Sequence, residues 1–227
     1  MKENEKANKR IKEPWPTKAA MEQVYKKNLW GGKPDTFYSG EGSHRPELVQ
    51  PYIDVVTTFL NSFQERISVC DLGCGDFNVG KELVTHAQSY VAMDIVPELI
   101  AYNQEKFKTD NLEFQCLDIA ADELPIADCV LLRQVLQHLS NAEVQRVVDK
   151  LPNYKYVILT EHLPVGDFIP NKDIISGQGI RLKRQSGLDL LASPFNLQIK
   201  EKKELLSVDL ERGKGRIVTW LYSSFNL

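Results

Sequence analysis

The sequence predicts an α/β protein in which helices cover both faces of a mainly parallel sheet of seven strands. Short apolar runs alternate with helix-like segments from residue 67 onward, which is typical of parallel sheets covered on both sides. The chain then ends in two strand-like segments joined by the glycine-containing connection 211–215, so we expect an antiparallel strand at the C-terminal end. The predicted strands are 67–72, 90–95, 112–117, 128–132, 156–160, 197–208 and 216–223.

Length and composition exclude several classes of protein. The chain has 227 residues, of which 42% are hydrophobic, which suits one domain with added segments. The net charge of −3 argues against a protein that grips nucleic acid by bulk positive charge. No apolar run approaches the roughly 18 residues that a membrane helix needs, and no secretory signal is recognised. With only 4 cysteines, a cytoplasmic protein with reduced thiols is expected.

The chain ahead of the sheet differs from the rest in composition. Residues 1–13 are rich in Lys and Glu and hold almost no apolar side chains, so we expect a flexible tail. A short amphipathic helix is expected over 17–29, and the glycine-rich segment that follows it holds Trp30 and Tyr38. These boundaries divide the chain into a tail (1–13), an N-terminal lid segment with a helix (14–46) and one domain (47–227).

Helices are predicted between most of the strands. Pro46 is suited to the first turn of a helix, and Ser140 with Glu143 forms a capping-box pattern. Beyond the helix that Pro46 opens, the predicted helices are 79–88, 97–108 and 141–151.

The strongest local motif is VCDLGCGDFNVG, residues 69–80. Gly73 and Gly75 allow the backbone to turn sharply after a buried strand and to approach a ligand closely. The third glycine of a dinucleotide fingerprint is replaced by Asn78, and Asp76 would repel a diphosphate. A nucleoside ligand without phosphates therefore fits this turn better than a dinucleotide.

Two carboxylates end the next two strands. Asp94 follows Gly75 by about 20 residues, the separation at which a carboxylate accepts hydrogen bonds from ribose hydroxyls. Asp118 is placed to accept from an exocyclic amine, and the neighbouring Ile119 to pack on an adenine face. The crevice suits adenosine joined to a cationic group. The alternatives are that Asp94 only caps the helix opened by Pro97, and that Asp118 is a plain loop acid.

The motifs DLGCG, MDIVPELI, LDIA and LLRQVLQHL, in this order, resemble the class I S-adenosylmethionine-dependent methyltransferases over about residues 50–223. The stretch FYSGEGS also resembles a bacterial subgroup of these enzymes. The resemblance implies a Rossmann-like sheet, S-adenosyl-L-methionine as cofactor and S-adenosyl-L-homocysteine as product. It implies that Arg133 and Gln134 border the sulfonium and the substrate. The cofactor-binding residues it implies are Asp71, Gly73, Gly75, Asp94, Ile95, Asp118, Ile119, Arg133 and Gln134.

Two histidines are candidates for acid–base chemistry. His138 follows the fourth strand and either acts as a base near the acceptor or hydrogen-bonds backbone between that strand and its helix. His162 follows the fifth strand and is a second candidate to face the acceptor. Cys70 and Cys74 have C-x-x-x-C spacing, but no second Cys/His pair follows at zinc-finger spacing, so no metal site is expected.

The acceptor side is expected to involve two irregular segments. Trp30 and Tyr38 either pack into the core or cover the cofactor as part of a lid. Segment 163–196 is long and irregular and follows the fifth strand, so we expect it to roof the pocket. Its basic residues Arg181, Lys183 and Arg184 either form a solvated surface or neutralise an acidic acceptor, and we expect Arg181 or Arg184 to reach inward to an anionic acceptor.

These observations favour methyl transfer from S-adenosylmethionine to an oxygen or nitrogen nucleophile. A small-molecule acceptor is favoured over protein or RNA, because residues 133–136 are Arg-Gln-Val-Leu and lack the Asn/Asp-Pro-Pro-Tyr loop of amino-directed DNA methyltransferases. No membrane partner is expected, nucleic acid is disfavoured, and the oligomeric state stays open. The rival functions are a nucleotide-dependent oxidoreductase and a non-catalytic module that binds S-adenosylmethionine.

Overall fold

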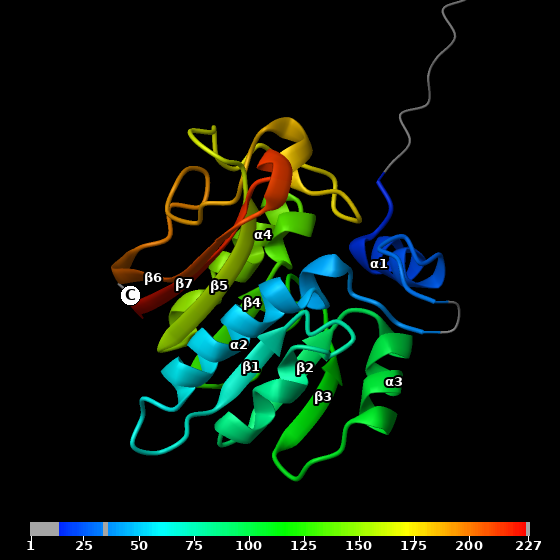
Figure 1. Ribbon diagram of the computed structural model, residues 1–227, viewed down its shortest axis with the longest axis vertical. Helices are drawn as coiled ribbons and strands as arrows, with labels where there is room; N and C mark the ends of the chain where they lie inside the picture. Colours follow the sequence, from blue (N-terminus) through cyan, green and yellow to red (C-terminus); the bar gives the residue numbers. More distant parts are fainter. Residues whose placement is uncertain (1–13, 34–35, 226–227) are drawn as a thin grey trace, which may run out of the picture.

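The computed structural model describes residues 14–33 and 36–225, so the predicted tail at 1–13 lies outside the described residues. The described chain contains a seven-stranded sheet in the order β3-β2-β1-β4-β5-β7-β6 (Figure 1). The strands are β1 Val69–Leu72, β2 Tyr90–Asp94, β3 Leu112–Cys116, β4 Cys129–Arg133, β5 Tyr156–Leu163, β6 Ile199–Asp209 and β7 Arg216–Phe225.

The sheet has the directions that the sequence predicts. Strand β1 pairs in parallel with β2 and β4, and β3 and β5 extend the parallel part on either side. Strand β7 pairs antiparallel with both β5 and β6, so it is the strand that opposes the others. The predicted α/β fold with an antiparallel C-terminal strand is therefore confirmed.

Helices cover both faces of the sheet because side chains alternate along each strand. Val130 and Leu132 of β4 point into one core, where they meet Val144 of α4. Leu131 points to the opposite core, where it meets Val56 of α2. The helices are α1 Thr17–Lys26, α2 Pro46–Leu60, α3 Pro97–Lys106 and α4 Asn141–Val148.

The predicted helix at 79–88 is wrong. The segment forms two short 3₁₀ turns, Gly80–Glu82 and Val84–His86. Phe77 has a left-handed backbone (φ 60°), and its buried ring packs directly against Gly80. The compact turns bring Leu83 into the same core, so tertiary packing has overridden the local helix preference.

Three parts of the molecule gather at the carboxyl edge of the sheet (Figure 1). Parallel strands all present this end on one side, which places the segments after β1, β2, β3 and β4 next to one another. The lid segment with α1 and the segment between β5 and β6 lie over the same edge. Within the described residues, no helix is long and apolar enough to cross a membrane.

The capping box at the start of α4 gives a first test. The Ser140 hydroxyl accepts from the Glu143 backbone N–H, and the Glu143 carboxylate accepts from the Ser140 backbone N–H. We expect Ser140→Ala to lower the free energy of unfolding by about 1 kcal/mol, because it leaves an N-terminal helix donor without its partner. Urea denaturation measures this change. The control is Ser207→Ala on exposed β6, which should stay within about 0.5 kcal/mol of wild type; equal effects in both variants would contradict the assignment.

Candidate functional site

A cavity of about 350 Å³ lies at the carboxyl edge of the sheet and has three walls. The first, which we call the strand-end wall, consists of Gly73, Cys74, Gly75, Asp94, Ile95, Leu117, Asp118, Ile119, Arg133, Gln134 and Val135. The lid wall consists of Thr17, Met21, Tyr25, Trp30, Ser39, Gly40, Gly42 and Ser43. The roof consists of Gln137, His138, Leu139, Gln178, Ile180 and Lys183.

The glycine turn after β1 forms the centre of the strand-end wall. Gly73 and Gly75 have φ of 78° and 56°, in the left-handed region that side chains disfavour. A Cβ on Gly73 would clash with Val135, and a Cβ on Gly75 would clash with Ser39 of the lid wall. Both glycines are therefore required by backbone conformation and by the close approach of neighbouring segments.

Asp94 both caps the backbone and lines the cavity. One carboxylate oxygen accepts from the Gly75 N–H at 3.2 Å and the other from the Val96 N–H at 3.1 Å. Val96 is the N-cap residue of α3, which has no side-chain cap, so Asp94 holds the chain just before the helix and also lines the cavity. Burial raises the pKa of Asp94 to about 6.

The segment after β3 supplies a second carboxylate and an apolar neighbour. Asp118 lines the cavity, and its Oδ1 accepts from the backbone N–H groups of Ala120 at 2.9 Å and Ala121 at 3.3 Å. Ile119 is buried beside it, and Ile95 lines the cavity from the end of β2. The strand-end residues predicted for an adenosine therefore do share one cavity.

Asp71 lies beneath the glycine turn and does not line this cavity. It faces a separate hole of about 30 Å³ that Tyr52 and Arg133 also line. Its Oδ2 accepts from the Tyr90 hydroxyl at 2.9 Å. Burial raises the pKa of Asp71 to about 6. Asp71 is therefore placed to support the glycine turn from below.

Arg133 and Gln134 join the end of β4 to the lid wall. The Arg133 guanidinium donates to the Gly42 carbonyl at 2.6 Å and to the Ser43 hydroxyl at 3.3 Å. Gln134 has a left-handed backbone (φ 58°), and its side chain packs closely against Gly42. Both residues line the cavity, as the sequence predicts for its border.

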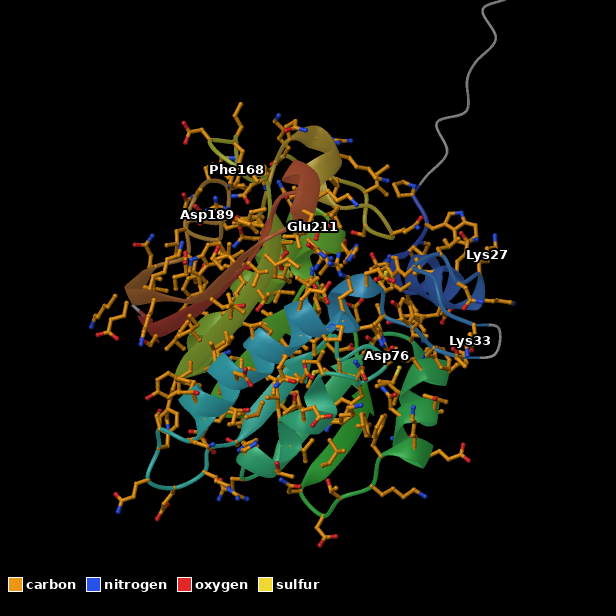
Figure 2. The ribbon with its side chains drawn as sticks, viewed as in Figure 1. Lys27, Lys33, Asp76, Phe168, Asp189 and Glu211 are labelled. Carbon is orange, nitrogen blue, oxygen red and sulfur yellow. The ribbon has the colours of Figure 1, made fainter. Side chains whose placement is uncertain are left out.

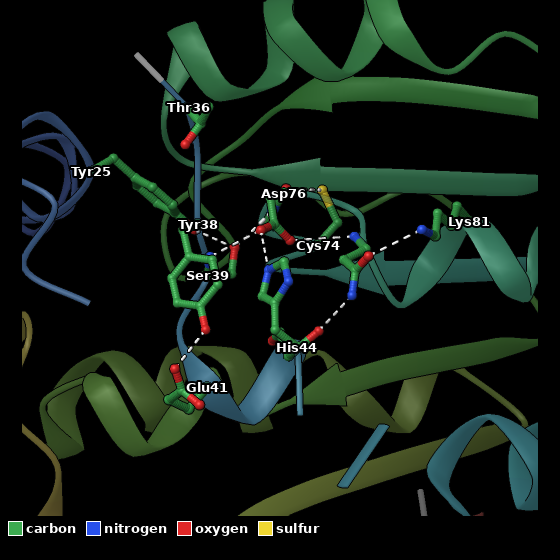
Figure 3. A network of polar contacts seen from close by, with 12 residues as sticks. Tyr25, Thr36, Tyr38, Ser39, Glu41, His44, Cys74, Asp76 and Lys81 are labelled. Carbon is green, nitrogen blue, oxygen red and sulfur yellow. Dashed lines mark hydrogen bonds and ion pairs between the residues drawn. The ribbon is translucent and has the colours of Figure 1, made fainter. Parts of the chain in front are cut away.

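A polar network around Asp76 fastens the lid segment to the glycine turn (Figure 3). One Asp76 carboxylate oxygen accepts from the Ser39 N–H at 3.0 Å and contacts His44 Nε2 at 2.6 Å. The Asp76 N–H donates back to the Ser39 hydroxyl at 2.7 Å, and Tyr25 shares a hydrogen bond with that hydroxyl at 3.0 Å. We call Ser39, His44 and Asp76 the lid clasp. Figure 2 shows Asp76 between the strand ends and the lid segment.

The two aromatic candidates of the lid segment have different positions. Trp30 lines the cavity and packs against His138, with 5.1 Å between ring centroids. Tyr38 lies outside the cavity and stacks on His44 at 4.2 Å. The sequence leaves open whether Tyr38 packs into the core or covers the cofactor; in the structure it contacts His44 of the lid clasp and does not line the cavity.

His138 lies in the roof with a defined tautomer. Its Nδ1 faces the Gly177 and Gly179 carbonyl oxygens at 3.1 and 3.3 Å. Carbonyls only accept, so Nδ1 carries the hydrogen and Nε2 is left as an acceptor. The Gln137 amide approaches Nε2 at a long 3.4 Å. Burial lowers the pKa of His138 to about 4, so the ring is neutral at pH 7.

His162 and the two arginines do not line the cavity. His162 Nε2 lies 2.8 Å from the Lys214 carbonyl oxygen at the β6–β7 connection, and burial lowers its pKa. Arg181 is 2% exposed and donates to backbone carbonyls around the 3₁₀ turn Leu136–His138. Arg184 is exposed and donates to the Asp173 carbonyl. The cation that the roof does present to the cavity is Lys183.

Sequence reasoning also missed Glu161 of β5. Its side chain is 0% exposed, and within the described residues neither carboxyl oxygen has a hydrogen-bond partner. Burial raises the pKa of Glu161 to about 8, with Arg181 nearby acting in the opposite direction. A carboxylate within the apolar run of β5 is the signal that would have found it.

Among residues 14–33 and 36–225, no group of three or more His, Cys, Asp or Glu side chains is arranged to hold a metal ion.

Comparison with known families identifies the central part of the chain. Residues 69–153 match the family model described as "Methyltransferase domain". This segment is similar to a methyltransferase domain. A malonyl-[acyl-carrier protein] O-methyltransferase from Acetivibrio thermocellus is 36% identical over 63 residues, which span 27% of this chain but only 22% of that protein.

Solved structures show the same fold for most of the chain. The N-methyltransferase NodS from Bradyrhizobium japonicum WM9, in complex with S-adenosyl-L-homocysteine, has a TM-score of 0.63 at 12% identity, covering 90% of this chain and 98% of that one. Magnesium protoporphyrin IX methyltransferase (ChlM) from Synechocystis PCC 6803, with bound S-adenosyl-L-homocysteine, has a TM-score of 0.59 at 16% identity, covering 92% and 100%. The predicted Rossmann-like sheet is therefore confirmed, and the match at 69–153 agrees with the resemblance to methyltransferases that the sequence motifs indicate.

The contact between the glycine turn and the lid wall gives a second test. Gly75→Ala places a methyl group in a left-handed residue and against Ser39, whereas Gly166→Ala (φ 75°) meets nothing within 4 Å. We expect Gly166→Ala to lower the free energy of unfolding by about 1 kcal/mol through backbone strain alone. Gly75→Ala should cost more and should speed hydrogen exchange at Ser39, whose N–H donates to Asp76. Equal costs and unchanged exchange would mean that the lid segment does not depend on this contact.

Proposed function

We propose that this chain is an S-adenosyl-L-methionine-dependent methyltransferase that methylates an oxygen or nitrogen nucleophile of a small-molecule acceptor. The observation that carries the proposal is the cavity in which the glycine turn, Asp94 and Asp118 of the methyltransferase domain meet. On this proposal residues 47–227 hold the cofactor and residues 14–46 form its lid. A cavity of about 350 Å³ lined on one side by the lid segment favours small acceptors over macromolecules.

The residues of the strand-end wall fit this cofactor. Asp94 offers carboxylate lone pairs to ribose hydroxyls, and Asp118 offers an acceptor for the adenine amine. Ile95 and Ile119 supply an apolar surface for the base. The glycine turn lets the backbone approach the methionyl part closely. When bound, the cofactor supplies an activated methyl group on a sulfonium.

The protein's own contribution is placement more than acid–base chemistry. The nucleophile has to lie in line with the methyl group at roughly 3 Å, and an oriented approach of this kind supplies much of the rate enhancement. His138 Nε2 is an acceptor for the hydrogen of an acceptor hydroxyl or amine, and its lowered pKa makes it an orienting group and a weak base. The lid clasp excludes water from the reacting groups. His162 lies outside the cavity and has no direct step in this mechanism.

Titration calorimetry separates this function from the oxidoreductase alternative. S-adenosyl-L-homocysteine should bind with a micromolar dissociation constant, about −8 kcal/mol, and NADH far more weakly. The reason is that the turn lacks the third glycine of a dinucleotide site, which is replaced by Asn78. Tighter binding of NADH would overturn the proposal. Release of labelled methyl groups onto cell metabolites then separates an enzyme from a non-catalytic binding module.

The raised pKa of Asp94 gives a pH-dependent test. Ribose hydroxyls donate more strongly to a carboxylate than to a carboxylic acid, and burial places the Asp94 pKa at about 6. S-adenosyl-L-homocysteine affinity should therefore fall as the pH is lowered through about 6, by at most about tenfold per pH unit. Asp94→Asn should bind about tenfold or more weakly at neutral pH, since hydrogen bonds to charged groups contribute about 1.5–3 kcal/mol.

The same variant separates Asp94 from Asp71, whose pKa burial also raises to about 6. If Asp94 is the titrating group, Asp94→Asn weakens the binding of S-adenosyl-L-homocysteine at neutral pH and also makes that binding independent of pH around 6. A variant that binds weakly but keeps the full pH dependence would assign the titration to Asp71.

A further inference from the structure

The cavity-lining residues include four charged side chains, and three of them are already engaged. Asp94 and Asp118 accept from backbone N–H groups of their own turns. Arg133 donates to the Gly42 carbonyl and to the Ser43 hydroxyl. The fourth, Lys183, makes no hydrogen bond and no ion pair with any other residue in the described parts of the chain, 14–33 and 36–225. Lys183 is therefore a cation without a protein partner at the roof of the cavity.

The backbone that carries Lys183 is firmly held. The 3₁₀ turn Arg181–Arg184 contains Arg181, which is buried and donates to the Leu136 carbonyl at 3.1 Å, the Leu139 carbonyl at 2.8 Å and Asn141 Oδ1 at 2.7 Å. Arg181 thus fixes this turn against the roof residues on the β4 side. The side chain of Lys183 starts from a fixed point at the edge of the cavity, although its own tip is exposed.

Apart from Lys183, the residues that line the cavity from the roof and from the lid wall are apolar or neutral. Ile180 and Leu139 line the roof, Met21 and Trp30 line the facing lid wall, and both cavity carboxylates belong to the strand-end wall. The imidazole of His138 is uncharged at neutral pH because burial lowers its pKa to about 4. A single cation beside apolar side chains is complementary to a molecule with an apolar body and one negative group.

We propose that Lys183 binds an anionic group, a carboxylate or a phosphate, of the methyl acceptor, whose apolar body packs between Trp30 and Ile180. The proposal rests on the proposed function, because it takes the roof side of the cavity as the acceptor's place. The sequence predicts that Arg181 or Arg184 recognises an anionic acceptor. The proposal assigns this role to Lys183 instead. Arg181 then serves as a positioning residue for the turn.

The test is a binding experiment with matched pairs of probes on protein saturated with S-adenosyl-L-homocysteine. 4-Hydroxybenzoate is compared with 4-hydroxybenzamide, and phenyl phosphate with phenol, by titration followed by ligand-observed NMR. The anionic member of at least one pair should bind about tenfold more tightly than its neutral partner, and the pair that responds distinguishes a carboxylate from a phosphate. Lys183→Met should remove this difference, and Lys183→Arg should retain it.

Lys200→Met on exposed β6 is the control for loss of one positive charge, and it should keep the preference for the anion. Affinity for S-adenosyl-L-homocysteine should be the same in wild type and in all three variants. A preference for the anion that survives Lys183→Met, or no preference in either pair, would overturn the assignment while leaving the proposed function in place. Weaker binding of S-adenosyl-L-homocysteine in Lys183→Met alone would also overturn it, since Lys183 would then serve the cofactor. If wild type fails to bind S-adenosyl-L-homocysteine, the proposed function itself is wrong.

Discussion

The carboxylate of Asp76 joins the lid segment to the sheet, and the cavity depends on this contact. Asp76 follows the glycine turn directly and holds both Ser39 and His44 of the lid segment. It is only 7% exposed, so these bonds form with little competition from water. This attachment holds part of the lid wall directly, because Ser39 itself lines the cavity. The sequence indicates that Asp76 repels phosphates; its place in the lid clasp gives it a second, structural role.

The parts of the fold that could be predicted are those encoded by neighbouring residues. Alternating apolar runs located the strands to within a few residues, and the glycine turn with Asp94 and Asp118 marked the strand ends. Parallel strands then bring these ends together without any further information. The helix predicted at 79–88 is wrong because its conformation depends on residues that are distant in the sequence. There the conformation is decided by the buried ring of Phe77, whose contacts come from strands distant in the sequence.

The acceptor side could not be predicted in the same way. Arg181, Lys183 and Arg184 look equivalent in the sequence, yet one is buried against backbone carbonyls, one lines the cavity and one lies on the surface. The orientation of the 3₁₀ turn that carries these three residues decides which of them faces the cavity. No periodic pattern in the sequence predicts that orientation. The lid segment and the glycine turn are far apart in the sequence; Ser39 and Asp76, for example, are 37 residues apart. No local sequence pattern predicts a contact between them.

The three walls also differ in how closely they are tied to the core of the sheet. The strand-end wall grows out of the sheet core, so changes there disturb packing, turn geometry and the match to the methyltransferase domain at 69–153 together. The lid wall and the distal part of the roof, residues 178–183, lie outside that segment and are joined to each other by the hydrogen bond from Gln178 to the Leu29 carbonyl at 2.9 Å. Substitutions in these two segments would change the shape and charge of one side of the cavity while leaving the strand ends intact. The architecture thus builds one half of the cavity from the sheet and the other half from segments that the sheet does not need for its own packing.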